Sequence, residues 1–210
     1  AVYFREFLRQ YLMAKRPEKE DYPEWNKRQY VLDSISWVSD PLYGWCNKNF
    51  KKNGQPYNIY TDGLKVYTTV DSRMQKYAEE AVYGHVAKFL QPAFDKENKH
   101  KPNAPFTGQL TKQQVAQIMK RSMVQSDRYR GMKAAGFDDE DIFASFRKPT
   151  EMTIFTYHGD IDTIMTPYDS IRYYKSFLRT GFMSMEPQTG YVKAYVGGIN
   201  FSHFQYDMAM

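Results

Sequence analysis

A serine and a lysine in the stretch Ser145-Phe146-Arg147-Lys148 have the spacing of a nucleophile and its base. The lysine lies one helical turn after the serine, where its amine could take the hydroxyl proton and prepare the oxygen for acyl transfer. That chemistry needs the serine at the N-terminus of a buried helix, whose amide dipoles stabilise an oxyanion. Here the serine falls near the C-terminal end of a short expected helix, and Pro149 follows the lysine. No S-x-N or K-[ST]-G sequence completes such a site. We therefore assign no catalytic residue, and an active serine hydrolase is the least favoured hypothesis.

Other residues that could bind a metal or a phosphate are scattered along the chain. None of the four histidines has a partner at metal-ligand spacing: His85, His100, His158 and His203. The acidic run Asp138–Asp141 lacks interleaved ligands and indicates the negatively charged start of a helix. No glycine-rich phosphate loop is present. We expect neither a metal nor a cofactor.

Two further features have structural interpretations. The single cysteine, Cys46, excludes an internal disulfide and any multi-cysteine metal site. The pair Gly197-Gly198 follows an expected strand and is interpreted as a tight turn or bulge.

The composition is that of a folded protein with a mild basic charge. The chain has 210 residues, of which 42% are hydrophobic and 17% aromatic, and its net charge is +5. No apolar run approaches the roughly 20 residues that span a bilayer. A stand-alone binding module for an anionic polymer, either a peptidoglycan strand or a nucleic acid, would use the charge and the aromatics. Most aromatics fall at helical core spacing instead of alternating with cations along a sheet face. This hypothesis therefore ranks second, and we expect no nucleic-acid partner.

The periodicity predicts an α+β fold with long helices, a small antiparallel sheet and a mainly helical insert. Apolar residues recur at helical spacing in 2–15, 24–39 and 72–90, and again in shorter segments at 111–119, 127–136, 138–146 and 166–178. Alternation predicts strands at 64–70 and 152–157 and a C-terminal hairpin at 182–196. Asp71, Thr111 and Thr166 are expected N-caps, with a capping box at Thr111. Prolines, asparagines and lysines in 91–108 predict a linker or exposed loop.

Three of these segments resemble those of one protein family. "AVYFREFLRQYL" is similar to the segment that leaves the glycosyltransferase domain of class A, or bifunctional, penicillin-binding proteins. "GLKVYTTVDSRMQKYAEEAV" resembles that family's strand and glutamine-bearing helix at the entry to the transpeptidase domain. "EPQTGYVKAYVGGINF" resembles its hairpin with a following glycine pair, and "FQYDMA" lies where the family has a phenylalanine-asparagine-arginine-alanine-like stretch. The motifs cover about a third of the chain, in the family's order.

The resemblance implies a fragment of a larger, penicillin-sensitive parent enzyme of peptidoglycan biosynthesis. That parent would be membrane-anchored at the periplasmic side, would polymerise lipid II and would cross-link stem peptides through a serine that attacks D-Ala-D-Ala. The fragment would comprise an inter-domain helical linker (1–60), the start of the transpeptidase domain (61–90), a helical insert (91–165), and a helix and hairpin (166–210). It would end before the catalytic S-x-x-K helix, and it would reach the membrane only through parts of the parent outside this chain.

The helical insert is also the expected docking surface for a protein activator. Arg128, Tyr129, Arg130 and Met132 combine cations with apolar contact on one short helix. An ordinary solvated helix face remains the alternative for these four residues. We expect the fragment itself to act as an inter-domain scaffold.

Overall fold

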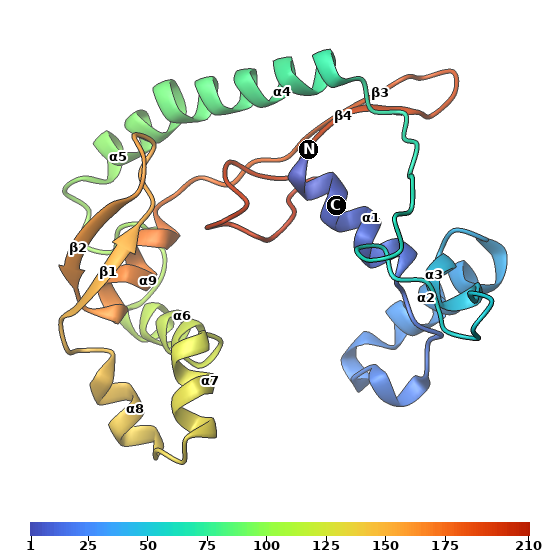
Figure 1. Cartoon of the computed structure of the whole chain (residues 1–210). Helices are drawn as coiled ribbons and strands as arrows, with labels where there is room; N and C mark the ends of the chain where they lie inside the picture. The colour runs from blue at the N-terminus through green and yellow to red at the C-terminus, as the bar shows by residue number, and fades with distance from the viewer. The chain divides into compact units, whose positions relative to one another are not determined.

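The computed structural model describes residues 1–210 and has the predicted α+β class (Figure 1). Its strands form two separate antiparallel pairs, β1 (Thr150–Ile154) with β2 (Ile161–Met165) and β3 (Phe182–Met185) with β4 (Val192–Val196). Contacts between Cα atoms divide the chain into two units. Unit 1 contains Ala1–Glu79 and Thr180–Met210, and unit 2 contains Glu80–Arg179. The four-part division expected from the sequence stays a prediction.

Unit 1 begins with α1 (Val2–Leu12), whose aromatic face packs against β4. The spacing of Phe4, Phe7 and Tyr11 places their rings in a continuous row, with centroids 6.3 and 5.5 Å apart. The Phe4 ring also lies 5.5 Å from that of Tyr195 on β4. The helical periodicity at the start of the chain therefore predicts both the helix and the face it packs.

Helix α2 (Lys27–Ser39) follows two 3-10 turns, Lys19–Asp21 and Glu24–Asn26. Its apolar residues were the basis for predicting it, yet they are exposed: Val31 by 52%, Ile35 by 57% and Val38 by 86%. The opposite side makes the contacts, because Asp33 accepts a hydrogen bond from the Tyr22 hydroxyl at 2.7 Å. The helix is therefore held by polar and aromatic contacts, and its apolar stripe faces outward.

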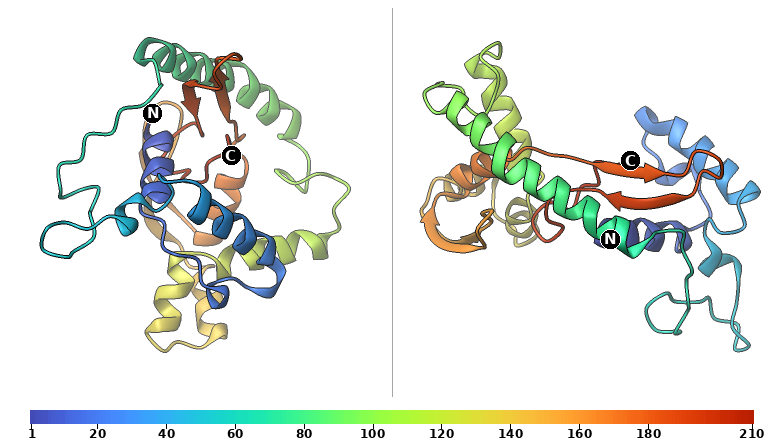
Figure 2. Two further views of the ribbon diagram at one scale, coloured as in Figure 1. Left: turned by 90° about the vertical axis from the view of Figure 1, so that its right-hand side faces the viewer. Right: turned by 90° about the horizontal axis from the view of Figure 1, so that it is seen from above.

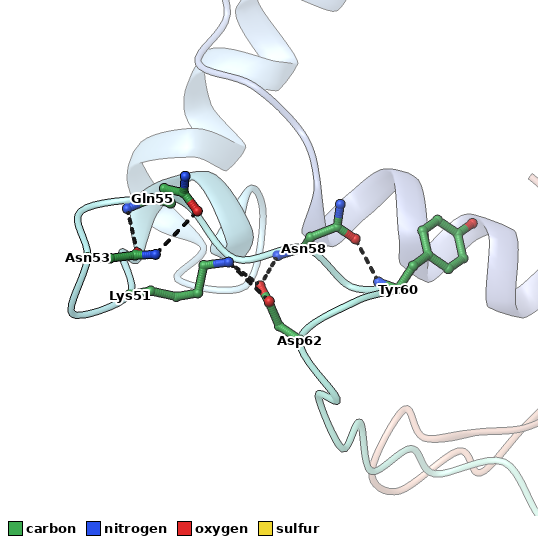
Figure 3. Close-up of polar contacts among 6 residues, drawn as sticks. All are labelled: Lys51, Asn53, Gln55, Asn58, Tyr60 and Asp62. Carbon is green, nitrogen blue, oxygen red and sulfur yellow. Dashed lines mark hydrogen bonds and ion pairs between the residues drawn. The ribbon is translucent and has the colours of Figure 1, made fainter.

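An irregular segment with a short helix, α3 (Trp45–Lys48), precedes the next long helix and is closed by an ion pair. The Lys51 ammonium lies 3.0 Å from both oxygens of Asp62, whose Oδ2 also accepts the Asn58 amide at 2.7 Å (Figure 3). The backbone amide and then Lys51 lower the pKa of the Asp62 carboxyl. Cys46 is buried beneath this segment, and burial raises the pKa of its thiol.

The strand predicted at 64–70 does not form. This segment is extended but carries no ladder, and only its end touches β4: Thr69 Oγ1 donates to the Val192 carbonyl at 2.8 Å, and the Asp71 amide donates to the Lys193 carbonyl at 2.9 Å. Alternation of residue types indicates which side chains could lie on one face. A β-strand also needs a neighbouring strand that forms backbone hydrogen bonds with it along its length. Asp71 is an N-cap as predicted, since its Oδ1 accepts the Arg73 and Met74 amides.

Helix α4 (Ser72–His85) runs on through a π-helical turn, Val86–Leu90, into α5 (Gln91–Asn98). The prediction of a linker starting at Gln91 is therefore wrong for its first eight residues. Pro92 lies in the first turn of α5, directly after the π-helical turn. The Gln91 side chain is buried and bonds the Ser176 carbonyl and the Leu178 amide, both at 2.9 Å, which fixes this helix within unit 2.

The remaining helices of unit 2 begin where local capping signals predict them. They are α6 (Lys112–Val124), α7 (Asp127–Ala134), α8 (Asp139–Ser145) and α9 (Pro167–Lys175). Thr111 and Gln114 form the predicted capping box of α6, and Thr166 accepts the Asp169 amide at the start of α9. Buried Met123, Ile142 and Phe146 form the core between them.

The helical part of unit 2 is joined by the β1–β2 hairpin. The sequence predicts one strand here, at 152–157, but β1 starts two residues earlier and pairs with β2 from Thr150–Met165 to Ile154–Ile161. The second strand escaped detection because His158, Gly159 and Asp160 break the alternation. The rings of Phe155, Tyr173 and Phe177 cluster behind the hairpin, with Phe177 centroids 5.3 and 5.1 Å from the other two.

The C-terminal hairpin of unit 1 forms as predicted. β3 and β4 run antiparallel, with Phe182 opposite Val196 and an irregularity in register between Ser184 and Met185 (Figure 2). The turn is closed by the Tyr191 carbonyl, which accepts the Glu186 amide at 2.9 Å. Three consecutive residues of β4, Ala194, Tyr195 and Val196, are buried, so β4 contributes to the core of this unit.

Candidate functional site

The serine of the S-x-x-K sequence is at the end of α8 and is buried, with 7% of its surface exposed. Its hydroxyl donates to the Ile142 carbonyl at 2.7 Å, one turn back along the helix, and accepts the Arg128 Nε–H at 3.1 Å. Lys148 is exposed and makes no hydrogen bond to Ser145 through its ammonium. The arrangement holds the hydroxyl in a structural role and provides no base next to it.

The four residues expected to dock a partner separate into two groups. Met132 and Tyr129 are partly buried and pack against the core of unit 2. The Tyr129 hydroxyl also donates to Asp139 Oδ1 at 2.9 Å, and that hydrogen bond raises the pKa of the tyrosine. Arg130 is exposed and pairs with Asp127 at 2.5 Å. Arg128 is exposed and has no carboxylate partner.

Two cations that the sequence analysis did not consider stack on aromatic rings in the same helical group. The guanidinium carbon of Arg147 lies 3.8 Å from the centroid of the Tyr168 ring, and the Lys120 ammonium lies 5.4 Å from that of Phe143. Arg128 is placed similarly, 5.9 Å from the centroid of the Phe146 ring. No sequence spacing indicates the contact of Arg147, because Tyr168 belongs to a different helix.

In unit 1, the residues of the motifs that are far apart in the sequence converge on β4. Gln75 is 6% exposed, and its side-chain amide makes two hydrogen bonds with the backbone of Tyr195. Gln75 Nε2 donates to the Tyr195 carbonyl, and the Tyr195 amide donates to Gln75 Oε1, both at 2.8 Å. The Tyr195 hydroxyl donates to Asp207 at 2.8 Å; burial first, and then Asp207, raises the pKa of this tyrosine.

The glycine pair after β4 is a place of close approach. A Cβ atom on Gly197 would lie 2.7 Å from the Tyr3 ring, and one on Gly198 would lie 2.3 Å from the Tyr3 hydroxyl. The Tyr3 hydroxyl donates to the Phe204 carbonyl. Neither glycine has a positive φ, and the space that their missing side chains leave is occupied by Tyr3 of α1.

A groove of about 580 Å³ lies between α1, the 66–70 segment and the start of α4. Its apolar lining comes from Phe4, Leu8, Val66 and Val70, and Arg5 is among its charged lining residues. The lining also includes the hydroxyls of Thr68 and Ser72 and the ammonium of Lys76, and it includes no histidine. No three His, Cys, Asp or Glu side chains in residues 1–210 come together as metal ligands would.

Comparison with known proteins gives one match. Residues 101–178 match the family model of the penicillin-binding protein middle domain. The match supports a penicillin-binding protein fragment. It includes α6 to α9 and the β1–β2 hairpin, and so lies in the part of the chain that the sequence motifs of the resemblance left uncovered. No curated protein and no solved structure matches the chain.

The match bears on fold and family, and it leaves the class of penicillin-binding protein open. Penicillin-binding proteins form an extracytoplasmic family of cell-wall enzymes, so the match is consistent with a role in cell-wall synthesis. None of the chain's helices combines the length and the apolar character needed to cross a membrane.

Proposed function

We propose that this chain is the part of a bifunctional, class A penicillin-binding protein that connects glycosyltransferase and transpeptidase modules. The observation that carries the proposal is the match of residues 101–178 to the penicillin-binding protein middle domain. The order of the three sequence motifs on either side of that match supports class A in particular. In this proposal the whole protein polymerises lipid II and cross-links stem peptides on the extracytoplasmic side of the membrane, where it is anchored.

The scaffold role proposed for the chain has a physical basis in unit 1. Tyr3, in the segment that resembles the exit from a glycosyltransferase domain, packs against Gly197 and Gly198 after β4. This close-packed aromatic contact holds α1 in a fixed position relative to the residues that follow β4. The chain would then contribute geometry to the transpeptidase domain, and the nucleophile would come from outside residues 1–210.

A docking role for the helical part of unit 2 belongs to the same proposal. Arg128 is the member of the original four residues that is both exposed and without a carboxylate partner. A partner protein that activates or positions the enzyme would bind at Arg128.

Sequencing the reading frame on both sides of this segment tests the assignment. We expect a glycosyltransferase domain with its catalytic glutamate upstream. Downstream we expect a glutamine-x-glycine-serine segment, followed by the S-x-x-K, S-x-N and K-T-G elements. The three downstream elements without an upstream glycosyltransferase would contradict the bifunctional class and retain the family. A frame that encodes little beyond these 210 residues would contradict the proposal and favour a stand-alone binding module.

A further inference from the structure

We propose that the C-terminal end of α8 is a docking surface for a short acidic protein segment, whose carboxylates are bound by the guanidinium groups of Arg128 and Arg147. The inference rests on the docking role in the proposed function and names the chemistry of the partner. In this surface Ser145, the serine of the S-x-x-K sequence, has a positioning role and no catalytic one. Of the four docking residues expected from the sequence, the proposed surface keeps Arg128 and leaves out Tyr129, Arg130 and Met132. Arg147 is added as the second cation.

Arg147 provides the more firmly placed of the two groups. Its guanidinium carbon lies 3.8 Å from the centroid of the Tyr168 ring, a distance at which the planar group stacks on the ring face. A stacked guanidinium keeps its N–H donors at the edge, where they can meet a carboxylate in a bidentate manner. Arg147 is exposed and forms no ion pair within the chain. Its position is fixed while its charge remains available.

Arg128 is held at one nitrogen only. Its Nε–H donates to Ser145 Oγ at 3.1 Å, and the guanidinium carbon lies 5.9 Å from the Phe146 ring centroid. The Ser145 hydroxyl is directed by its own bond to the Ile142 carbonyl, so the oxygen presents a lone pair to the arginine. The two terminal NH₂ groups of Arg128 are left for an external acceptor. Ser145 is therefore a positioning residue for this arginine.

Phe146 adjoins both arginines. Arg128 lies over its ring, Arg147 is the next residue, and the Phe146 carbonyl accepts the Tyr168 amide at 3.1 Å. Exposed Lys148 adds a third positive charge at the same end of the helix. On α7, by contrast, exposed Lys133 is paired with Asp139 at 2.6 Å and exposed Arg130 with Asp127 at 2.5 Å.

The surrounding charges favour a short acidic protein segment over a long polyanion. Asp127 precedes Arg128, and its side chain is 97% exposed. The first turn of α8 adds Asp139, Glu140 and Asp141. A nucleic acid that ran across this surface would place phosphates against these carboxylates, and like charges oppose such a contact. One or two carboxylates on a short segment can meet the arginines and avoid the acidic neighbours.

Fluorescence anisotropy of the whole chain with a fluorescein-labelled oligoglutamate peptide tests the surface. We expect Arg128→Gln with Arg147→Gln to weaken binding by about tenfold or more, because two charge-assisted contacts are lost. Ser145→Ala keeps both charges and removes the acceptor that orients Arg128, so we expect a loss of roughly twofold to fivefold. Thermal unfolding of each variant checks that the fold is retained.

The matched control is Arg28→Gln with Lys52→Gln, which removes the same formal charge from exposed positions of unit 1. It should leave the affinity within about twofold of the original chain. Equal losses in the two double variants would show a net-charge effect and overturn the proposal. So would no measurable binding by the folded chain, or tighter binding of a single-stranded oligonucleotide that depends on the two arginines. These outcomes are independent of the reading frame, so failure here is distinct from failure of the class A assignment.

Discussion

At the scale of single residues, the side chain of Gln75 makes hydrogen bonds to β4 of the kind that a neighbouring strand would make. Its amide group, like a backbone peptide, has an N–H donor and a C=O acceptor, and these bond the carbonyl and the amide of Tyr195. The outer edge of β4 is thereby satisfied at a buried position without a further strand. A strand edge can be closed in this way wherever a helix passes close enough for a glutamine to reach.

Replacing Gln75 with leucine tests this function. Two buried backbone groups of Tyr195 lose their partners, so we expect the free energy of unfolding to fall by about 2–4 kcal/mol. Chemical denaturation measures the loss. Tyr77→Ala, on the exposed side of the same helix, is the control and should change stability by less than about 0.5 kcal/mol. A Gln75→Leu protein as stable as the original would show that water replaces the side chain.

Contacts between residues that are near in sequence could be predicted, and contacts between distant parts of the chain could not. Asp71, Thr111 and Thr166 act on amides two or three positions away, so their capping follows from local pattern alone. The partner of Gln75 is 120 residues away. For the candidate docking surface, Arg128 was found by its type and charge, but Arg147 was missed because stacking on Tyr168 depends on how two helices pack.

At the scale of elements, the helices were easier to predict than the strands because a helix satisfies its own backbone. The segment 64–70 has the residue types of a strand and contacts β4 only at its end, since a ladder depends on a partner that local pattern does not reveal. Helix α5 was not predicted because the prolines and asparagines of 91–108 are typical of loops, yet the π-helical turn before α5 continues directly into it.

The irregular segment closed by Asp62 provides an element-scale prediction with a pH dependence. Its carboxylate has a lowered pKa in the folded chain, so its contribution is present above the unfolded value of about 4 and is lost as the pH falls through the folded value. We expect the amide proton of Asn58 to shift over that acidic range when followed by NMR. In Asp62→Asn this titration should disappear, whereas the exposed carboxylate change Asp21→Asn should leave it intact. Persistence of the shift in Asp62→Asn would assign it to another group.

At the scale of the whole molecule, the chain forms two units with separate cores. Unit 2 is built around Met123, Ile142 and Phe146, and unit 1 is built around β4 and Tyr3 of α1. The family match lies entirely within unit 2, while two of the three motifs of the resemblance, "AVYFREFLRQYL" and "EPQTGYVKAYVGGINF", lie entirely in unit 1. The family-model match and these two motifs therefore lie in different units of the chain.

Separate cores predict separate responses to damage. Tyr3→Ala removes a buried aromatic side chain and a hydrogen bond, so we expect unit 1 to lose roughly 3 kcal/mol. Hydrogen exchange should then accelerate in β4 and remain unchanged in α6 of unit 2. Tyr60→Ala, at an exposed position, serves as the control. Equal acceleration in both units would mean that the chain unfolds as one cooperative body.

The division at Glu79 and Thr180 also sets an order of events on the ribosome. Unit 2 is a single uninterrupted stretch, so every residue of its core has been synthesised by the time Arg179 is added. Unit 1 must wait for Thr180–Met210, which supply β4 and the glycines that seat Tyr3. Until then α1 and Gln75 lack β4 as a partner, and the apolar face of α1 stays exposed. Within residues 1–210, α1 is therefore synthesised before unit 2 but contacts β4 only after unit 2 is complete.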